Sequence, residues 1–478
     1  MSIVRILAVV LALISLLMLP AFIMALVLGE YSMITAFLFP MTLGAALGLS
    51  AALFFRKTPL SFRARDGFLL VFLVWVFSTL LGSLCYYLAP VDMSMVNSIF
   101  ESACGFSTTG ATTISDLEAL PRSLLFWRSI NHWAGGMGII LLFIALLPLL
   151  GVSGFQLIKA EVPGPEKERL RPRVTEAAKI LWLVYCIFTA ALILLYRLGG
   201  MEWFDALCQA LTIISTGGVS VRNNGFAHYN SPFIDWITVI FMILGAINYN
   251  LYYRISRKNF RDMVHNTEIR AFFLILIVSS LVVSINLIPA YGSFGEALRY
   301  GSFQAVSILT TTGNSRMDYS VWPALAQSVL LCLMLTGGCS GSTAGGIKVI
   351  RHVVLFKQAG NELRRMLYPR GVFSIQLNRK VGRKDVVYGV AGFVFVYFVI
   401  IGITTLVTSA SGLDLFSSLY TSIAITGNIG AAFSPAGLIN SYAGFPDYLK
   451  LFYSLVMIIA RLELWTVLIL FTPGYWKN

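Results

Sequence analysis

Long apolar segments recur along the chain and set its architecture. Nine uninterrupted segments each reach the about 20 residues that a helix needs to cross a hydrocarbon core of about 30 Å. They cover residues 4–28, 32–55, 67–88, 132–150, 177–198, 232–253, 271–290, 386–408 and 449–471. A tenth region, 321–368, begins apolar, passes through a glycine-rich segment at 337–346 and ends basic, which predicts a broken helix. The pattern predicts an all-α polytopic membrane protein with ten spans.

Four shorter apolar stretches lie between pairs of these spans and are too short to cross a membrane. Their approximate ranges are 93–107, 203–214, 294–309 and 415–424. Segments of this length are typically re-entrant or buried. Each leads into a Thr-Gly pair and a polar loop, and the glycines are Gly110, Gly217, Gly313 and Gly427. We therefore predict two N-terminal helices, within 1–58, and four linked helix–pore loop–helix repeats around one central pore, at 66–153, 174–256, 268–368 and 384–474.

The composition agrees with a bilayer as the main solvent. The chain has 478 residues, of which 57% are hydrophobic and 12% charged, whereas soluble domains average about 25% charged residues. The net charge is +13, and basic residues follow the second, fourth and sixth spans and are dense in 348–384. By the positive-inside rule this distribution places both termini in the cytoplasm and the short stretches on the outer side. It also explains the charge better than a nucleic-acid partner does.

The four Thr-Gly loops have the composition of an ion-coordinating backbone. Non-helical backbone is tolerated at membrane depth only where protein buries it or water reaches it. Glycine allows a positive φ, so successive carbonyl oxygens can turn toward a shared axis and replace the hydration shell of a monovalent cation. One such pair alone would more simply be a helix C-cap. Four at equivalent places favour a pore with a selectivity filter.

These loops resemble those of the Trk/Ktr/HKT superfamily of potassium transporters, and the resemblance covers the whole chain. Residues 337–351 (GGCSGSTAGGIKVIR) closely resemble the signature loop of the bacterial members. The two additional N-terminal spans resemble the TrkH/TrkG branch rather than the shorter KtrB branch. The resemblance implies a bacterial inner-membrane homodimer that takes up K⁺, with no organic cofactor and with regulation by a cytosolic, nucleotide-binding TrkA-type subunit.

The resemblance also implies which residues bind the ion, because the potassium-binding carbonyls of the family directly precede each filter glycine. The corresponding residues are Thr108 and Thr109, Ser215 and Thr216, Thr311 and Thr312, and Ile425 and Thr426. The filter glycines and the residues that follow them are Gly110, Gly217, Gly313 with Asn314, and Gly427 with Asn428. Ile425 stands where the other loops have a polar residue, which matters little if backbone carbonyls bind the ion.

The glycine-rich segment is a candidate gate. Its five glycines within ten residues are Gly337, Gly338, Gly341, Gly345 and Gly346, and each costs a helix about 1 kcal/mol relative to alanine. This composition predicts a flexible loop that blocks the pore at rest below the third filter loop, in agreement with the family resemblance. The alternative is close helix packing through Gly341 and Gly345.

Arg461 lies near the middle of the last predicted span, where a charge is costly and usually faces a cavity. We interpret it as a pore-facing electrostatic barrier close to the glycine-rich segment. The alternative is an ion pair with another helix. Glu463 is only two residues away and lies on a different helix face, so it is a poor partner.

Other classes of function have weaker support. A proton- or sodium-coupled symporter with alternating access would call for inverted repeats and acidic residues in the spans, whereas these repeats run in parallel and the spans hold almost no Asp or Glu. A membrane sensor with a closed pore is disfavoured by the four intact glycines. No Ser/His/Asp set or HExxH motif points to an enzyme.

Overall fold

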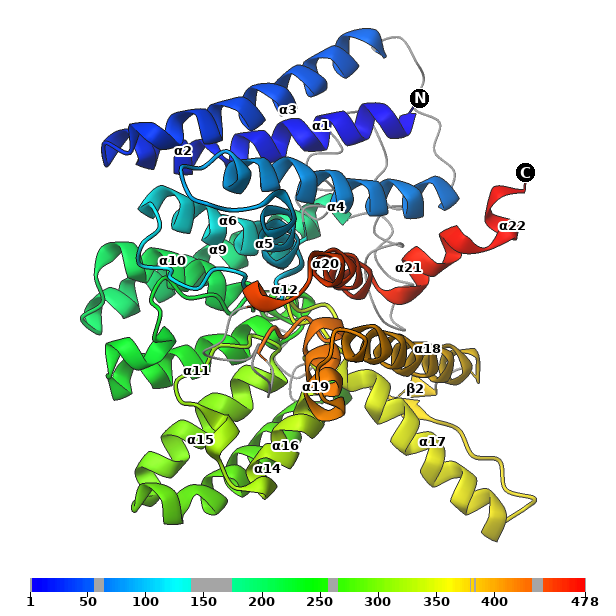
Figure 1. Ribbon diagram of the computed structural model, residues 1–478. Helices are drawn as coiled ribbons and strands as arrows, with labels where there is room; N and C mark the ends of the chain where they lie inside the picture. The colour runs from blue at the N-terminus through cyan, green and yellow to red at the C-terminus, as the bar shows by residue number, and fades with distance from the viewer. Residues whose placement is uncertain are drawn as a thin grey trace.

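The computed structural model describes residues 2–55, 64–138, 174–256, 265–378, 380–381, 384–431 and 442–477. The N-terminal part consists of α1 (Ser2–Leu17), which continues after a short break as α2 (Leu19–Val27), and of α3 (Ile34–Phe54). These helices lie side by side along one edge of the molecule, next to the first repeat (Figure 1).

Four units of the predicted kind follow, each opening with a long helix and a short one. The first contains α4 (Ala64–Tyr87), α5 (Met95–Ser107) and α6 (Arg122–Gly136). The second contains α9 (Val174–Leu198), α10 (Trp203–Ile214), α11 (Pro232–Ala246) and α12 (Tyr249–Ser256). The third contains α14 (Thr267–Tyr291), α15 (Phe294–Leu309), α16 (Ala324–Met334) and α17 (Val349–Leu367). The fourth contains α18 (Lys384–Ser409), α19 (Leu415–Thr426), α20 (Asp447–Arg461) and α21 (Leu464–Leu468).

The remaining elements are small. The strands β1 (Gln376–Leu377) and β2 (Lys380–Val381) pair antiparallel between α17 and α18. A last short helix, α22, covers Pro473–Trp476. Single 3₁₀ turns cover Tyr31–Met33, Gly225–Tyr229, Tyr319–Val321, Tyr442–Gly444 and Ile469–Phe471.

The prediction of an all-α, multi-pass membrane protein is confirmed. Among the described residues, six helical segments are long and apolar enough to cross a membrane: Ile3–Val27, Tyr31–Phe54, Arg65–Tyr87, Ala178–Leu198, Thr267–Tyr291 and Asp385–Ser409. They are the two N-terminal spans and the first helix of each repeat.

The later helix of each repeat differs from the predicted uninterrupted span. The span predicted at 132–150 is wrong at its start, because α6 begins at Arg122 and ends at Gly136; residues 139–150 lie outside the described part. The span at 232–253 is interrupted after α11, where Ile247 is extended. The span at 449–471 is wrong as one helix, because α20 and the segment Leu464–Phe471 meet at 111°. The break predicted in the third repeat is confirmed between α16 and α17.

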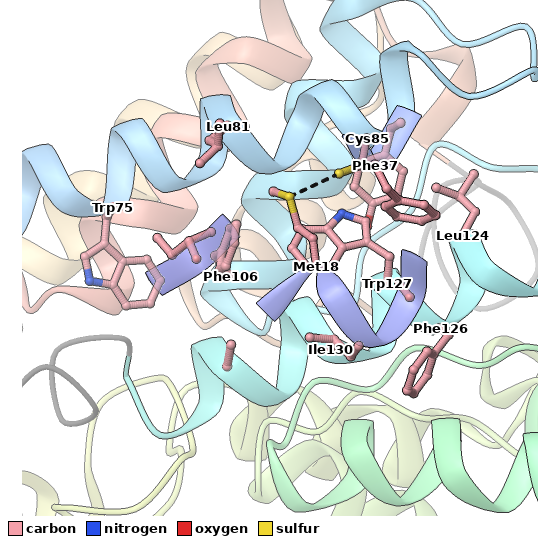
Figure 2. Packing of buried hydrophobic residues seen from close by; sticks show 14 of the residues in the cluster. Met18, Phe37, Trp75, Leu81, Cys85, Phe106, Leu124, Phe126, Trp127 and Ile130 are labelled. Carbon is pink, nitrogen blue, oxygen red and sulfur yellow. Dashed lines mark hydrogen bonds between the residues drawn. The ribbon is translucent and has the colours of Figure 1, made fainter. Parts of the chain in front are cut away.

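The N-terminal helices share one apolar core with the first repeat (Figure 2). Met18 at the α1–α2 junction, Phe37 of α3, Cys85 of α4 and Trp127 of α6 are all fully buried there. The Cys85 and Met18 sulfur atoms lie 3.7 Å apart. Inside a bilayer such helices associate through close van der Waals packing, so these fully buried contacts make the extra helices part of the same packed core.

Candidate functional site

The four short helices end in the same backbone conformation. In each loop one residue other than glycine adopts the left-handed region, and these residues are Thr108 (φ 55°), Thr216 (φ 53°), Thr311 (φ 55°) and Asn428 (φ 53°). Two residues later each loop has a glycine with positive φ, namely Gly110 (80°), Gly218 (69°), Gly313 (74°) and Gly430 (77°). Such φ values are strained for residues with a Cβ, so the repetition marks equivalent positions.

The hydrogen bonds of the helix ends repeat with the same spacing. The residue after each left-handed position donates its N–H to the carbonyl five residues earlier: Thr109 to Cys104 (3.0 Å), Gly217 to Thr212 (2.8 Å), Thr312 to Ser307 (2.9 Å) and Ile429 to Ala424 (2.8 Å). This is a Schellman-type C-cap. The four short helices thus do end in C-caps, as the alternative interpretation proposed, but the left-handed cap residues are Thr or Asn. The positive-φ glycines lie beyond these caps.

This equivalence corrects the register predicted for the second and fourth loops. Gly218 and Gly430, not Gly217 and Gly427, match Gly110 and Gly313. Gly427 has a helical φ of −78° at the end of α19. The sequence pattern misplaced these loops by one and three residues because a Thr-Gly pair also occurs within the cap.

The misplaced register changes the carbonyls assigned to the fourth loop. Ile425 and Thr426 belong to the last turn of α19. The Ile425 carbonyl already accepts the N–H of Asn428 at 3.2 Å. The residues equivalent to Thr108 and Thr109 are Asn428 and Ile429. In the second loop they are Thr216 and Gly217, so Ser215 lies one position too early.

The four loops close into a ring in chain order. Carbonyl oxygens of each loop lie against the positive-φ glycine of its neighbour, so a Cβ there has no room. A Cβ added at Gly110 would lie 2.7 Å from the carbonyl oxygen of Gly217, and one added at Gly218 would lie 1.7 Å from that of Thr312. A Cβ added at Gly313 would lie 1.8 Å from the oxygen of Ile429, and one added at Gly430 would lie 2.2 Å from that of Thr109. These four oxygens belong to equivalent residues, which gives the ring an approximate fourfold arrangement.

Side chains also join neighbouring loops. Asn428 donates from Nδ2 to the Thr109 hydroxyl (2.9 Å) and to the Met457 carbonyl (3.1 Å). Within the third loop, the backbone carbonyl of the buried Asn314 accepts the Ser307 hydroxyl. The predicted residues Thr108, Thr109, Thr311, Thr312 and Asn428 are thus gathered in one buried ring.

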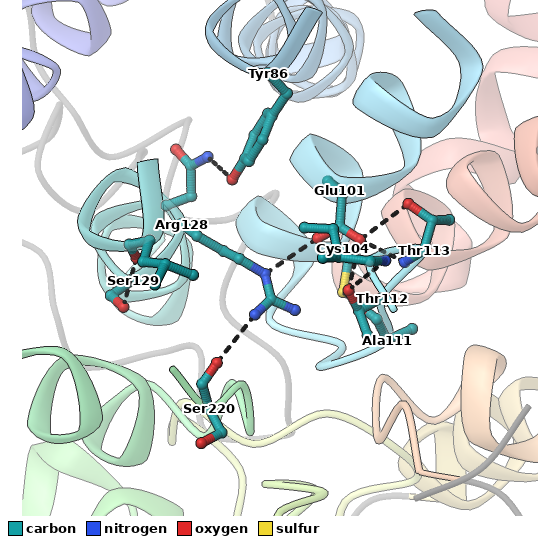
Figure 3. Close-up of polar contacts among 12 residues, drawn as sticks. Tyr86, Glu101, Cys104, Ala111, Thr112, Thr113, Arg128, Ser129 and Ser220 are labelled. Carbon is teal, nitrogen blue, oxygen red and sulfur yellow. Dashed lines mark hydrogen bonds and ion pairs between the residues drawn. The ribbon is translucent and has the colours of Figure 1, made fainter. Parts of the chain in front are cut away.

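A buried ion pair between Glu101 and Arg128 binds the first loop (Figure 3). The sequence analysis did not identify it. Glu101 of α5 accepts the Thr112 hydroxyl (2.8 Å) and the Nε–H of Arg128 (3.1 Å). Arg128 of α6 also donates to the Ser220 carbonyl of the second loop at 3.2 Å. In the second loop Gln209 occupies the place of Glu101 and donates to the Ser220 hydroxyl at 2.8 Å. A carboxylate within the short apolar stretch 93–107 was the available signal.

Replacing Arg128 by methionine is expected to destabilise the protein strongly. Arg128 and Glu101 have exposed side-chain fractions of 3% and 1%, and removing one partner of a buried pair costs about 3–5 kcal/mol. Thermal unfolding in detergent measures the effect. The matched control is Arg365→Met on α17, whose half-exposed pair with Glu362 contributes about 0–1 kcal/mol. Equal melting temperatures for the two variants would contradict the role of the buried pair.

The glycine-rich segment 337–346 lies directly against this ring. The Gly345 N–H donates to the Thr311 hydroxyl at 2.6 Å, and a Cβ at Gly345 would lie 2.4 Å from the Gly427 oxygen. Thr343 donates its hydroxyl to the carbonyls of Ile214 (3.2 Å) and Gly245 (2.9 Å). The segment is therefore in contact with the ends of the second, third and fourth short helices.

The backbone of this segment is not helical. Gly337, Gly341 and Gly346 have φ values of 77°, 73° and 69°, and Gly338 packs against the Ala246 carbonyl. Close packing of continuous helices through Gly341 and Gly345 does not occur here, because no helix runs through them.

Arg461, the last residue of α20, binds the glycine-rich segment. Its guanidinium donates to the carbonyl oxygens of Thr343 (2.6 Å), Gly135 (3.1 Å) and Gly136 (2.9 Å). Glu463 instead pairs with Arg351 of α17 at 2.5 Å. Arg461 thus connects α20, the end of α6 and the segment at one point.

The comparisons with known proteins agree with this architecture. The family model TrkH, described as a cation transport protein, matches residues 36–477. The chain is 35% identical to the Trk system potassium uptake protein TrkH of Escherichia coli K12, over 92% of each protein. It is also 35% identical to that of Halomonas elongata, over 100% of this chain and 99% of the relative.

A solved structure is similar over the full length. The crystal structure of the potassium transporter TrkH from Vibrio parahaemolyticus superposes with a TM-score of 0.88 at 33% identity, covering 100% of this chain and 99% of that one. The family resemblance predicted from the four loops is confirmed, and the chain belongs to the TrkH family of cation transport proteins, which are transporters rather than enzymes.

Proposed function

We propose that this chain takes up K⁺ and that the ring of four loops is its selectivity filter. The observation that carries the proposal is the closed ring, in which equivalent carbonyls of four loops each lie against the positive-φ glycine of the neighbouring loop. Rings of carbonyl oxygens can replace the hydration shell of K⁺. The proposed ligands are the carbonyls of Thr108 and Thr109, Thr216 and Gly217, Thr311 and Thr312, and Asn428 and Ile429. The C-terminal ends of α5, α10, α15 and α19 add negative partial charge at the ring.

We propose further that the segment 337–346 is the gate. Its contacts with Thr311 and Gly427, at the ends of the third and fourth short helices, support a position across one mouth of the ring. Arg461 holds it there through Thr343 and adds a positive charge that repels cations. The five glycines keep the backbone free of side chains and allow the segment to change conformation.

The remaining family properties belong to the same proposal. The chain would reside in the bacterial inner membrane with both termini cytoplasmic, as a homodimer of four-repeat protomers with boundaries near 66–153, 174–256, 268–368 and 384–474. A cytosolic TrkA-type subunit would bind the basic face, for which 254–270 and 348–384, which includes α17, are candidates. In Figure 1, α17 extends away from the other helices, and both Arg364 and Arg365 on it are exposed.

A proton- or sodium-coupled symporter is the alternative. A proton-coupled transporter needs a titratable side chain, usually a carboxylate, that can take up the proton. Three of the four buried carboxylates among the described residues are paired with arginines: Glu101 with Arg128 (3.1 Å), Asp205 with Arg222 (2.8 Å) and Asp235 with Arg316 (3.0 Å). The fourth, Glu268, accepts backbone N–H groups. These ion pairs favour a passive pore driven by the membrane potential, which supplies about 2.3 kcal/mol per charge per 100 mV.

Uptake of ⁸⁶Rb⁺ into proteoliposomes that contain only this chain tests the proposal. A K⁺ gradient alone drives the flux, and external K⁺ or Na⁺ competes. We expect uptake that K⁺ blocks and Na⁺ barely affects. Uptake that requires an added proton or sodium gradient would instead support the symporter.

A further inference from the structure

Glu268 lies at the point where the glycine-rich segment meets α17. It occupies the first turn of α14, where the Asn266 side chain caps the helix by accepting the N–H groups of Glu268 and Ile269. Only 6% of Glu268 is exposed. The capped helix end therefore fixes a buried carboxylate beside the segment.

One oxygen of this carboxylate accepts hydrogen bonds from the glycine-rich segment and from the start of α17. Glu268 Oε1 accepts the N–H of Ser340 at 2.7 Å and the N–H of Ile350 at 3.2 Å. Ser340 lies before Gly341, whereas Ile350 is the second residue of α17. A single atom thus fastens the chain at two points ten residues apart, on either side of 341–349.

The contact also caps α17 from another helix. The first N–H groups of a helix have no partner within it, and Lys348 at the N-cap position of α17 provides no side-chain cap. A carboxylate suits this position because it accepts the free N–H and offsets the positive end of the helix dipole.

The same end of α17 is held on a second side. Arg351 pairs with Glu463 at 2.5 Å, and its guanidinium lies 3.6 Å from the centre of the Phe393 ring. Glu463 has a φ of 65° at the bend between α20 and α21, two residues after Arg461. A displacement of α17 consequently reaches the segment through Glu268 and reaches Arg461 through Glu463.

We propose that Glu268 is a positioning residue of the gate, whose carboxylate holds the segment 337–346 in its closed position and couples it to α17. This inference rests on the proposed gating function of the segment. Any partner that moves α17 would have to break the two Glu268 hydrogen bonds to open the pore.

The variant Glu268→Gln tests the inference, because glutamine keeps the size of the side chain and removes its charge. We expect passive ⁸⁶Rb⁺ leak to rise about tenfold, the ratio that corresponds to about 1.4 kcal/mol. The ratio of K⁺ to Na⁺ competition is expected to stay unchanged, because the ring is untouched. The matched control is Glu362→Gln on the exposed side of α17, for which wild-type leak is expected.

A second readout reports on the segment itself. Cys339 is fully buried and adjoins Ser340, so its reaction with a charged maleimide measures release of the segment. Because Cys186 and Cys332 are exposed, both are replaced by serine in the background. Labelling of Cys339 is expected to be faster in Glu268→Gln than in the parent.

The outcomes separate the two proposals. Leak and labelling rates both equal to the parent would overturn the role of Glu268. Faster labelling without leak, in Glu268→Gln and also in Arg461→Ala, would retain Glu268 as the anchor and reject the gate. If Glu268→Gln does not fold, Glu268→Asp keeps the charge on a shorter side chain and should still label faster; parental labelling in that variant would overturn the inference.

Discussion

Replacing Gly430 by alanine is expected to abolish K⁺ uptake almost completely. Gly430 has a φ of 77°, and an added Cβ would lie 2.2 Å from the Thr109 oxygen and 2.6 Å from the Ala111 nitrogen. The fourth loop would therefore have to move away from the first and open the ring. A loss of about 3 kcal/mol in ion binding corresponds to an about 100-fold fall in uptake.

The matched control is Gly427→Ala in the same loop. Gly427 has a φ of −78°, which alanine adopts readily. An added Cβ would lie 2.9 Å from the Ile423 oxygen and 3.0 Å from the Ile429 side chain, a smaller overlap than at Gly430, so a much smaller fall in uptake is expected. Uptake of ⁸⁶Rb⁺ by purified, folded variants measures both. Near-normal uptake in Gly430→Ala together with a complete loss in Gly427→Ala would restore the register predicted from the Thr-Gly pairs.

Replacing Arg461 by alanine is expected to increase passive conduction strongly. Each hydrogen bond from a charged group contributes about 1.5–3 kcal/mol, so loss of the contact with Thr343 shifts the segment toward its open position by roughly 10- to 100-fold. The positive charge next to the pore is lost as well. Leak of ⁸⁶Rb⁺ from loaded proteoliposomes, without a cytosolic partner, measures the change.

Arg461→Lys separates the two effects of this residue. Lysine keeps the charge but cannot reach three carbonyls with the planar fork of a guanidinium. If the positive charge forms the barrier, leak stays low in Arg461→Lys. If the hydrogen bonds to the three carbonyls hold the segment closed, leak rises in both Arg461→Ala and Arg461→Lys. Wild-type leak in a well-folded Arg461→Ala would leave Arg461 with a purely structural role.

The long helices could be predicted because hydropathy alone defines them. The first helix of each repeat is apolar over more than 20 residues, as in Thr267–Tyr291, and no tertiary contact is needed to identify it. Later helices are less apolar, as in α6 with Arg128, Asn131 and His132. A break in such a helix was visible in the sequence only in the third repeat, where the glycine-rich segment marks it. At the bend between α20 and α21, Glu463 has a positive φ and pairs with Arg351 of α17. Neither feature can be recognised in the sequence around Glu463.

The sequence predicted the four loops of the ring, but it predicted the correct close-contact glycine in only two of them. Four Thr-Gly pairs identified the loops, and the first and third pairs agree with the backbone equivalence of Gly110 and Gly313. In the second loop Thr216, the threonine of the pair, itself occupies the left-handed position, and in the fourth loop the whole pair, Thr426 and Gly427, comes before the left-handed Asn428. Which glycine meets a neighbouring carbonyl is decided between repeats about 100 residues apart in the sequence, where local patterns carry no information.

The location of bound ions tests the central proposal most directly. Crystals grown with Rb⁺ or Tl⁺ in place of K⁺ would reveal the ion by its anomalous scattering. We expect a peak on the axis of the ring, within coordination distance of the carbonyl oxygens of Thr109, Gly217, Thr312 and Ile429. An empty axis, with ions bound instead to side-chain carboxylates elsewhere in the chain, would contradict a filter made of backbone carbonyls.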